Sequence, residues 1–149
     1  MTKKRKNNST DISDTNFKKL SIQVSLNGLS FCVADTVSHQ VLLSDTIIFQ
    51  EELNPEELLS HLIGLFKKHE LEEKSFDEVI LIHRNTLFGL VPKPLFDPNT
   101  LTDYLKFNTK LFSNDALAFD EVEHEDMVNV YVPYTNVNNY IYDLSLIHI

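Results

Sequence analysis

The 149-residue chain has one cysteine, no tryptophan and only three glycines, and these shortages exclude several classes of protein. The single cysteine, Cys32, excludes a framework of intramolecular disulfides and fits a reducing compartment. With so few glycines we expect no glycine-rich loop that cradles phosphate, and the P-loop pattern is absent. No apolar run approaches the roughly 20 residues of a transmembrane helix. We therefore expect a cytoplasmic protein without a membrane-spanning segment.

Basic residues are scarce outside the N-terminus. Residues 1–19 hold six of the 13 lysines and arginines and two of the 22 acidic residues, which leaves seven basic and 20 acidic residues, a formal charge of −13, on the remainder. Such a body repels the phosphates of nucleic acids, so we expect no nucleic-acid partner. The cluster Lys3–Lys6 lies in a polar stretch without periodicity, which predicts a disordered tail over residues 1–18.

The stretch around which the rest of the chain is organised is Lys19–Phe49, and its pattern predicts three consecutive strands. From Leu20 onward, apolar residues alternate with serine and glutamine, the period-2 signature of a half-buried strand. Asn27-Gly28 follows, a pair typical of a type I′ hairpin turn in which both central residues have positive φ. A looser turn over residues 36–40 leads into the third strand.

The remaining segments alternate between helix and strand signals. Asn54-Pro55-Glu56-Glu57 predicts a capped helix start, and the apolar run over residues 79–82 indicates a central strand covered on both faces. Further patterns predict an extended piece at 86–91, a helix from Asp97-Pro98, strands at 117–122 and 127–132, and a last helix from Thr135. The expected order is β-β-β-α-β-(β)-α-β-β-α.

That order is the opening of the ribonuclease H-like and actin-like folds, so the expected fold class is α/β with a mixed sheet. Nucleases of this architecture carry a metal-binding aspartate in the first strand, and actin-like ATPases carry Asp-x-Gly at the first hairpin. If Gly28 is that glycine, the acid position is Leu26, or Ser25 with a shift of one. Neither is a carboxylate. This absence favours a non-enzymatic role with no catalytic residues and no metal site, and leaves Asn27 and Gly28 as candidate cofactor-binding residues.

Other polar groups give weaker signals. His83-Arg84-Asn85 follows the apolar strand, where α/β proteins often place ligand-facing groups, although a polar exit from the strand explains it better. His61 and His69 lie eight residues apart, too far for a common metal site on one helix, which favours packing or surface roles.

Three later motifs, together with the strands of the meander, resemble an uncharacterised bacterial family, a domain-of-unknown-function group typical of Bacteroidetes. They are FGLVPKPLF at Phe88–Phe96, LKFN at Leu105–Asn108 and VNVYVPY at Val128–Tyr134, and the resemblance covers Leu20–Asp143. It implies an actin-like domain of two similar subdomains, also similar to pilus-assembly proteins of the PilM type. In those relatives the Asp-x-Gly loop binds ATP, and this chain departs from them there.

Residues 144–149 look like translated adapter read-through. We therefore expect residues 19–143 to form the N-terminal subdomain of a longer protein whose second subdomain is missing. The leading hypothesis is a non-catalytic protein-interaction or scaffold protein on a degenerate actin-like fold, with unidentified protein partners and no cofactor. The alternative is an ATP-binding actin-like protein that uses the hairpin at Asn27-Gly28 and the missing subdomain.

Overall fold

The computed structural model describes residues 18–107, 110–111 and 115–147. The predicted tail over residues 1–18 lies outside this range except for Lys18, and residues 148–149 of the predicted read-through tail also lie outside it. Contacts divide the chain into two units. The first combines the residues up to Arg84 with those from Asn136 onward, and the second is Asn85–Thr135.

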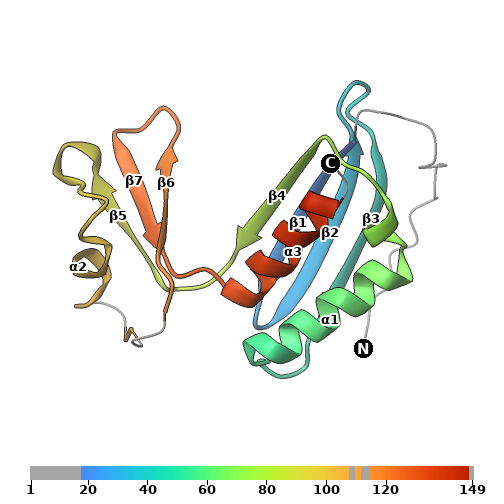
Figure 1. Ribbon diagram of the computed structural model, residues 1–149, viewed down its shortest axis with the longest axis horizontal. Helices are drawn as coiled ribbons and strands as arrows, with labels where there is room; N and C mark the ends of the chain where they lie inside the picture. Colours follow the sequence, from blue (N-terminus) through green and yellow to red (C-terminus); the bar gives the residue numbers. More distant parts are fainter. Residues whose placement is uncertain (1–17, 108–109, 112–114, 148–149) are drawn as a thin grey trace. The chain divides into compact units, whose positions relative to one another are not determined.

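The first unit is built on a four-stranded mixed sheet (Figure 1). Its strands are β1 (Lys18–Ser25), β2 (Gly28–Asp35), β3 (Val41–Ile48) and β4 (Glu78–His83), in the spatial order β3-β2-β1-β4. The β1–β2 and β2–β3 pairs are antiparallel, and β4 is parallel to β1. The predicted meander and the parallel return of the chain are therefore confirmed.

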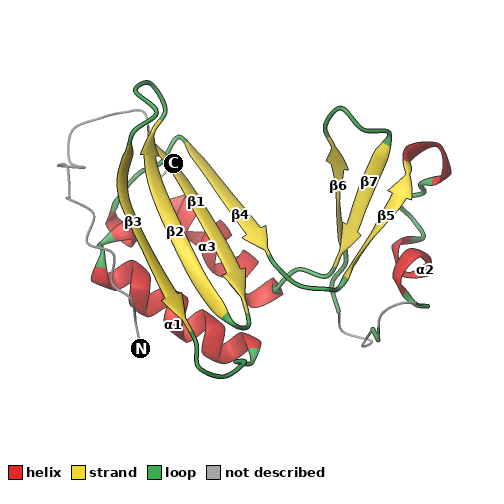
Figure 2. Cartoon of the chain, turned by 180° about the vertical axis from the view of Figure 1, so that it is seen from behind, coloured by secondary structure: helices red, strands yellow, loops and turns green. Residues whose placement is uncertain are grey.

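Two helices, α1 (Pro55–Lys68) and α3 (Thr135–Ile147), cover one face of this sheet, and Figure 2 shows the strands from the opposite side. Alternate residues of β1 and β2 supply the buried face, as the period-2 pattern predicts. Buried leucines and a phenylalanine of α1 pack over them. The buried members are Leu20, Ile22, Val24, Leu29, Phe31, Val33, Leu58, Leu62, Leu65 and Phe66.

The start of α1 has the predicted capping box. The Asn54 side-chain oxygen accepts from the Glu57 amide at 2.9 Å, and the Glu57 carboxylate accepts from the Asn54 amide at 3.1 Å. Pro55 occupies the first turn, where its missing N–H costs no hydrogen bond. The local sequence therefore sets where the helix begins.

Three side-chain contacts tie α3 to the first half of the chain. The Tyr140 hydroxyl donates to Glu72 at 2.6 Å, and its ring packs on Phe66 with 5.9 Å between centroids. The Asn136 amide donates to the Pro55 carbonyl at 2.7 Å. Burial, the hydrogen bond to Glu72 and the charge of Glu72 all raise the pKa of Tyr140, so the phenol stays protonated. These contacts hold α3 on the sheet beside α1.

Asp45 joins β3 to the end of α1. Its carboxylate lies 2.8 Å from His69 Nε2 and 3.2 Å from Lys68 Nζ, and the His69 ring packs edge-on against Phe31. Partial burial works to raise the pKa of Asp45, but the hydrogen bonds from His69 and Lys68 outweigh burial and lower this pKa. His69 therefore has a packing role, as predicted.

Replacing the charge at this junction is expected to change how stability depends on pH. Because the folded-state pKa of Asp45 is lowered, its contribution is present above the unfolded-state pKa of about 3.9 and is lost as pH falls through the folded-state value. Asp45→Asn should therefore lower the free energy of unfolding by up to about 1 kcal/mol at neutral pH and by less in acid. Urea unfolding across this pH range measures the difference. The control is Asp103→Asn, which removes an exposed pair with Lys106. A constant difference at every pH would contradict the prediction.

The apolar run Val79–Ile82 does not occupy the predicted central position. Its strand β4 pairs with β1 on one side and is an edge strand among the described residues. None of its residues is buried, and the Ile82 side chain is 46% exposed. The predicted central position of this strand is wrong. An apolar run indicates that a strand favours burial, but distant segments of the chain decide which strands pair with it.

The second unit is a three-stranded antiparallel sheet with a short helix. Its strands are β5 (Phe88–Pro92), β6 (Ala118–Val122) and β7 (Met127–Tyr131), in the order β5-β7-β6, with α2 (Leu101–Leu105) over one face. The predicted helix start at Asp97-Pro98 is wrong. The Asp97 side chain accepts a hydrogen bond from the Asn99 amide at 2.9 Å and so stabilises a turn. This turn competes with helical backbone, and the helix begins only at Leu101.

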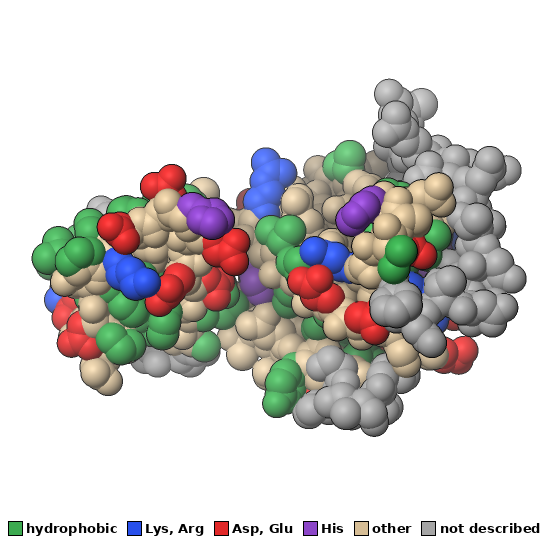
Figure 3. Space-filling view, turned by 90° about the horizontal axis from the view of Figure 1, so that it is seen from above, with side chains coloured by type: hydrophobic (Ala, Val, Ile, Leu, Met, Phe, Trp, Pro, Cys, Tyr) green, Lys and Arg blue, Asp and Glu red, His purple; other side chains and the backbone are tan. Residues whose placement is uncertain are grey.

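The surface carries mixed charges. Figure 3 shows acidic and basic side chains interspersed on the face in view. None of the helices in the described ranges is long and apolar enough to cross a membrane.

Candidate functional site

The β1–β2 hairpin carries the candidate residues Asn27 and Gly28. Ser25 pairs with Gly28 across the ladder, so the turn itself consists of Leu26 and Asn27. No described glycine has a positive φ, and Asn27 is not among the described residues that do. The predicted type I′ turn centred on Asn27-Gly28 is therefore wrong, because the ladder closes one residue earlier than that turn requires.

A distant segment holds this turn in place. The Asn27 carbonyl accepts from the Phe49 amide and the Leu26 carbonyl accepts from the Leu53 amide, both at 2.9 Å. Both donors belong to the connection between β3 and α1. The turn is therefore fixed by main-chain bonds within the unit.

Gly28 has a structural reason to be glycine. A Cβ atom at this position would lie 2.7 Å from the Ile47 carbonyl oxygen of the neighbouring strand β3, closer than real Cβ contacts come. The backbones of β2 and β3 approach closely here, and only a residue without a side chain fits. The packing of the sheet therefore explains this glycine without a ligand.

The hairpin presents no carboxylate. Ser25 and Leu26 stand where the acid is required, and the Ser25 hydroxyl donates to the Gly28 carbonyl at 3.0 Å. Within the described residues, no group of three or more His, Cys, Asp or Glu side chains gathers as a metal site. The hairpin therefore offers no carboxylate for a metal ion, and its Ser25 hydroxyl is used in a hydrogen bond within the turn.

The polar residues at the end of β4 and directly after it form hydrogen bonds within their own units. His83 Nε2 lies 2.7 Å from the Asn138 side-chain oxygen of α3, and the Arg84 amide extends the ladder to β1. In the second unit, the Asn85 side chain donates to the Val132 carbonyl at 2.9 Å. His83 therefore connects β4 to α3 within the first unit, and Asn85 connects two chain segments within the second.

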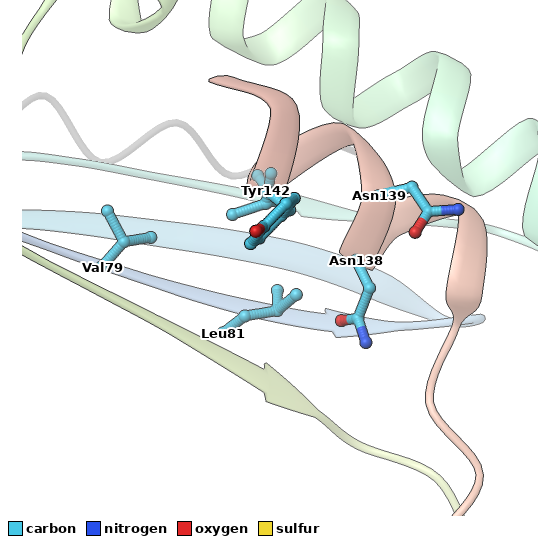
Figure 4. A pocket seen from close by; sticks show the side chains of 6 residues that line it. Val79, Leu81, Asn138, Asn139 and Tyr142 are labelled. Carbon is cyan, nitrogen blue, oxygen red and sulfur yellow. The ribbon is translucent and has the colours of Figure 1, made fainter. Parts of the chain in front are cut away.

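A shallow groove of about 400 Å³ lies between β4 and α3 (Figure 4). Val79 and Leu81 project from the strand, and Asn138 points from the helix toward it. Tyr142 on the rim is 63% exposed. The complete lining is Val79, Leu81, Asn138, Asn139, Ile141 and Tyr142. The groove combines an apolar floor with amide groups and contains no ionisable acid or base except the Tyr142 phenol.

The second unit exposes an apolar sheet face that the sequence analysis missed. Phe88 and Leu90 of β5 are 52% and 55% exposed, while Val91, on the opposite face, packs with the α2 residue Leu105. The alternation of large residues at 88 and 90 around Gly89 is the signal that could have revealed this face. We call the surface formed by Phe88, Leu90, Asp120, Asn129 and Tyr131 the β5 face.

Polar groups lie among the apolar ones on the β5 face. Tyr131 is directly opposite Phe88, and Asn129 is opposite both Leu90 and Asp120. Burial, together with the charge of Asp120 and a hydrogen bond to it, raises the pKa of Tyr131 to about 12. The side-chain oxygen of Asn129 is buried and has no hydrogen-bond donor within the described part of the chain. The face therefore combines two exposed apolar side chains with a buried oxygen that lacks a hydrogen bond within the described residues.

Comparison with known proteins identifies a solved structure with a similar fold. No curated protein sequence matches the chain. A Bacteroides thetaiotaomicron crystal structure, described as a protein with actin-like ATPase fold and unknown function, matches with a TM-score of 0.78 and 15% identity. The match covers 92% of this chain and 52% of the other, so this chain spans about half the length of that structure. At this identity the likeness shows the fold, which is actin-like as predicted.

A second structure is similar more weakly. It is the cytoplasmic domain of EpsL, an inner-membrane component of the type II secretion system of Vibrio cholerae. The TM-score is 0.48 at 14% identity, over 87% of this chain and 52% of that one, which is too low to support an argument about this chain.

The family resemblance seen in the sequence motifs is also confirmed. The match to the family extends over residues 7–145, nearly the whole chain, and includes both units and the β1–β2 hairpin. The chain belongs to the family described as protein of unknown function, DUF3822.

Proposed function

We propose that this protein is a non-catalytic protein-interaction domain on an actin-like fold. The observation that carries the proposal is the β1–β2 hairpin, where Ser25 and Leu26 stand in place of an acid and Gly28 is needed for packing against β3. A nucleotide site of the actin-like kind requires a carboxylate that positions Mg²⁺ at this hairpin. We therefore assign this domain a role in binding another protein and not in binding a nucleotide.

The β5 face supports the interaction part of the proposal. Exposed apolar residues that lie together on one sheet face are typical of protein-binding surfaces, and aromatic residues are enriched at their centres. Phe88 and Leu90 meet this description, because they are 52% and 55% exposed on the same face of the sheet. The partner we propose is a protein with apolar side chains at its contact surface.

Nucleotide binding gives the first test. With millimolar ATP and Mg²⁺, thermal unfolding of the chain should occur at the same temperature as with Mg²⁺ alone. A ligand at about 100 times its Kd adds roughly 2.7 kcal/mol to the stability, which shifts the midpoint by several degrees. A shift of that size would contradict the proposal and favour the ATP-binding alternative at Asn27-Gly28.

The interaction itself is tested by capture with matched variants. A protein crosslinked to the wild-type chain should be lost with Phe88→Ser/Leu90→Ser and retained with Ile48→Ser. Ile48 is the matched control because it is 73% exposed and lies on the first unit. If every captured protein is retained by the double variant, the β5 face is not the binding surface and this part of the proposal fails.

A further inference from the structure

The outer edge of β3 is long and apolar. Among the described residues β3 ends the first sheet and pairs with β2 alone (Figure 2). Asp45 is the only charged residue of the strand, and the apolar residues Val41 and Ile48 are 53% and 73% exposed. An edge strand of this composition is a template for pairing with another strand unless some feature of the fold closes it.

The main-chain groups of β3 point alternately toward β2 and toward the outer edge. The Phe49 amide donates to the Asn27 carbonyl at 2.9 Å, so the odd-numbered residues that precede it face β2. Ser44, Thr46 and Ile48 therefore direct their N–H and C=O groups outward. Thr46 is at the centre of this row, so a strand that pairs along the edge must bond to its N–H.

Asp45 already occupies the Thr46 N–H. Its Oδ1 accepts from the Thr46 amide at 2.9 Å, while its Oδ2 lies 2.8 Å from His69 Nε2 and 3.2 Å from Lys68 Nζ. The carboxylate is thus held from the end of α1 in the position that covers the edge donor. Hydrogen bonds to an ionised acceptor are stronger than those between neutral groups, so an added strand would have to displace a strong bond.

The charge of Asp45 also opposes pairing with a second copy. In an antiparallel pair of two β3 strands with a two-fold axis through Thr46, Asp45 lies opposite Ile47 of the other copy. The two Asp45 residues are then diagonal neighbours at about 7 to 8 Å, where like charges repel. Without this carboxylate no charge of β3 opposes the pair, and the edge becomes complementary to itself.

We propose that Asp45, positioned by His69 and Lys68, closes the outer edge of β3 against antiparallel pairing with β3 of a second copy of this chain. The proposal goes beyond the binding role of the β5 face and does not depend on it, because the two surfaces lie in different units. A single side chain thereby decides whether the first sheet ends at β3 or continues into another molecule.

Sedimentation equilibrium of the full chain tests the proposal at concentrations from about 1 to about 200 µM, the range of weak dimers. Asp45→Ala removes both the acceptor for the Thr46 N–H and the charge at the edge. This variant should associate more tightly than the wild-type chain by about tenfold or more, which corresponds to about 1.4 kcal/mol. Association equal to that of the wild type would overturn the proposal.

The matched control is Asp45→Ala/Thr46→Pro. Both variants lack the contacts of Asp45 with α1, so they share the loss of stability that these contacts cause. Proline at position 46 removes an N–H that points outward, which leaves the ladder to β2 intact and prevents a second strand from pairing. The double variant should return to the association of the wild type. Equal association of the two variants would show that lower stability causes it, and this also overturns the proposal.

Amide exchange of the wild-type monomer gives a second test that needs no variant. The Thr46 N–H should exchange at least about tenfold more slowly than an unprotected amide, because it is bonded to the Asp45 carboxylate. Exchange at the unprotected rate would show that Asp45 does not cover the edge, and the proposal would fail. Circular dichroism of each variant checks that it is folded.

Discussion

Phe66→Ala is expected to lower the free energy of unfolding of the first unit by about 3 to 5 kcal/mol. Phe66 is 1% exposed, and it packs on Tyr140 where α1 meets α3. Alanine would leave a cavity between the two helices and the sheet, and the loss would include both the transfer free energy of the ring and the cost of the cavity. The midpoint of thermal unfolding should fall by roughly 10 to 20 °C, measured by circular dichroism.

The matched control for this prediction is Phe107→Ala. Phe107 is 85% exposed, so the same substitution removes almost no buried contact and should change stability by no more than about 0.5 kcal/mol. Similar losses in the two variants would contradict the core position of Phe66. A loss in Phe66→Ala that is far below 3 kcal/mol would show that α3 moves to fill the cavity.

Gly28→Val is expected to lower the free energy of unfolding by about 1 to 3 kcal/mol. The added Cβ would lie 2.7 Å from the Ile47 carbonyl, a main-chain atom that cannot move without disturbing the β2–β3 ladder. The loss needs no ligand and should appear in chemical unfolding of the protein alone. Any effect of this variant on ATP binding must therefore be separated from its effect on folding.

Gly64→Ala gives the opposite expectation and serves as the control. Gly64 lies inside α1 and has no atom within 4 Å of the position of a Cβ. Alanine there should stabilise the protein by about 0.5 to 1 kcal/mol, because it restricts the unfolded chain and favours the helix. If Gly28→Val were as stable as the wild type, the close approach of β3 would not explain Gly28, and a ligand role for the hairpin would regain support.

Local signals predicted much of the first unit. The alternation from Leu20 to Val33 gave the buried faces of β1 and β2, and Asn54 with Glu57 marked the start of α1. Such patterns can be recognised in the sequence because an alternating strand or a capping box involves only residues that are near neighbours in the chain. The same locality explains the misplaced start of α2, where the turn at Asp97 competed with the helix signal.

The sequence by itself determined the order of elements, the half-buried character of the meander and the missing acid at the first hairpin. Tertiary structure alone decided why Gly28 is a glycine, that β4 lies at an edge, and that Phe88 and Leu90 share an exposed face. Each of these depends on which distant segment lies beside the residue. Periodicity and capping report the conformation that a segment prefers, whereas strand neighbours are selected by contacts between residues far apart in the chain.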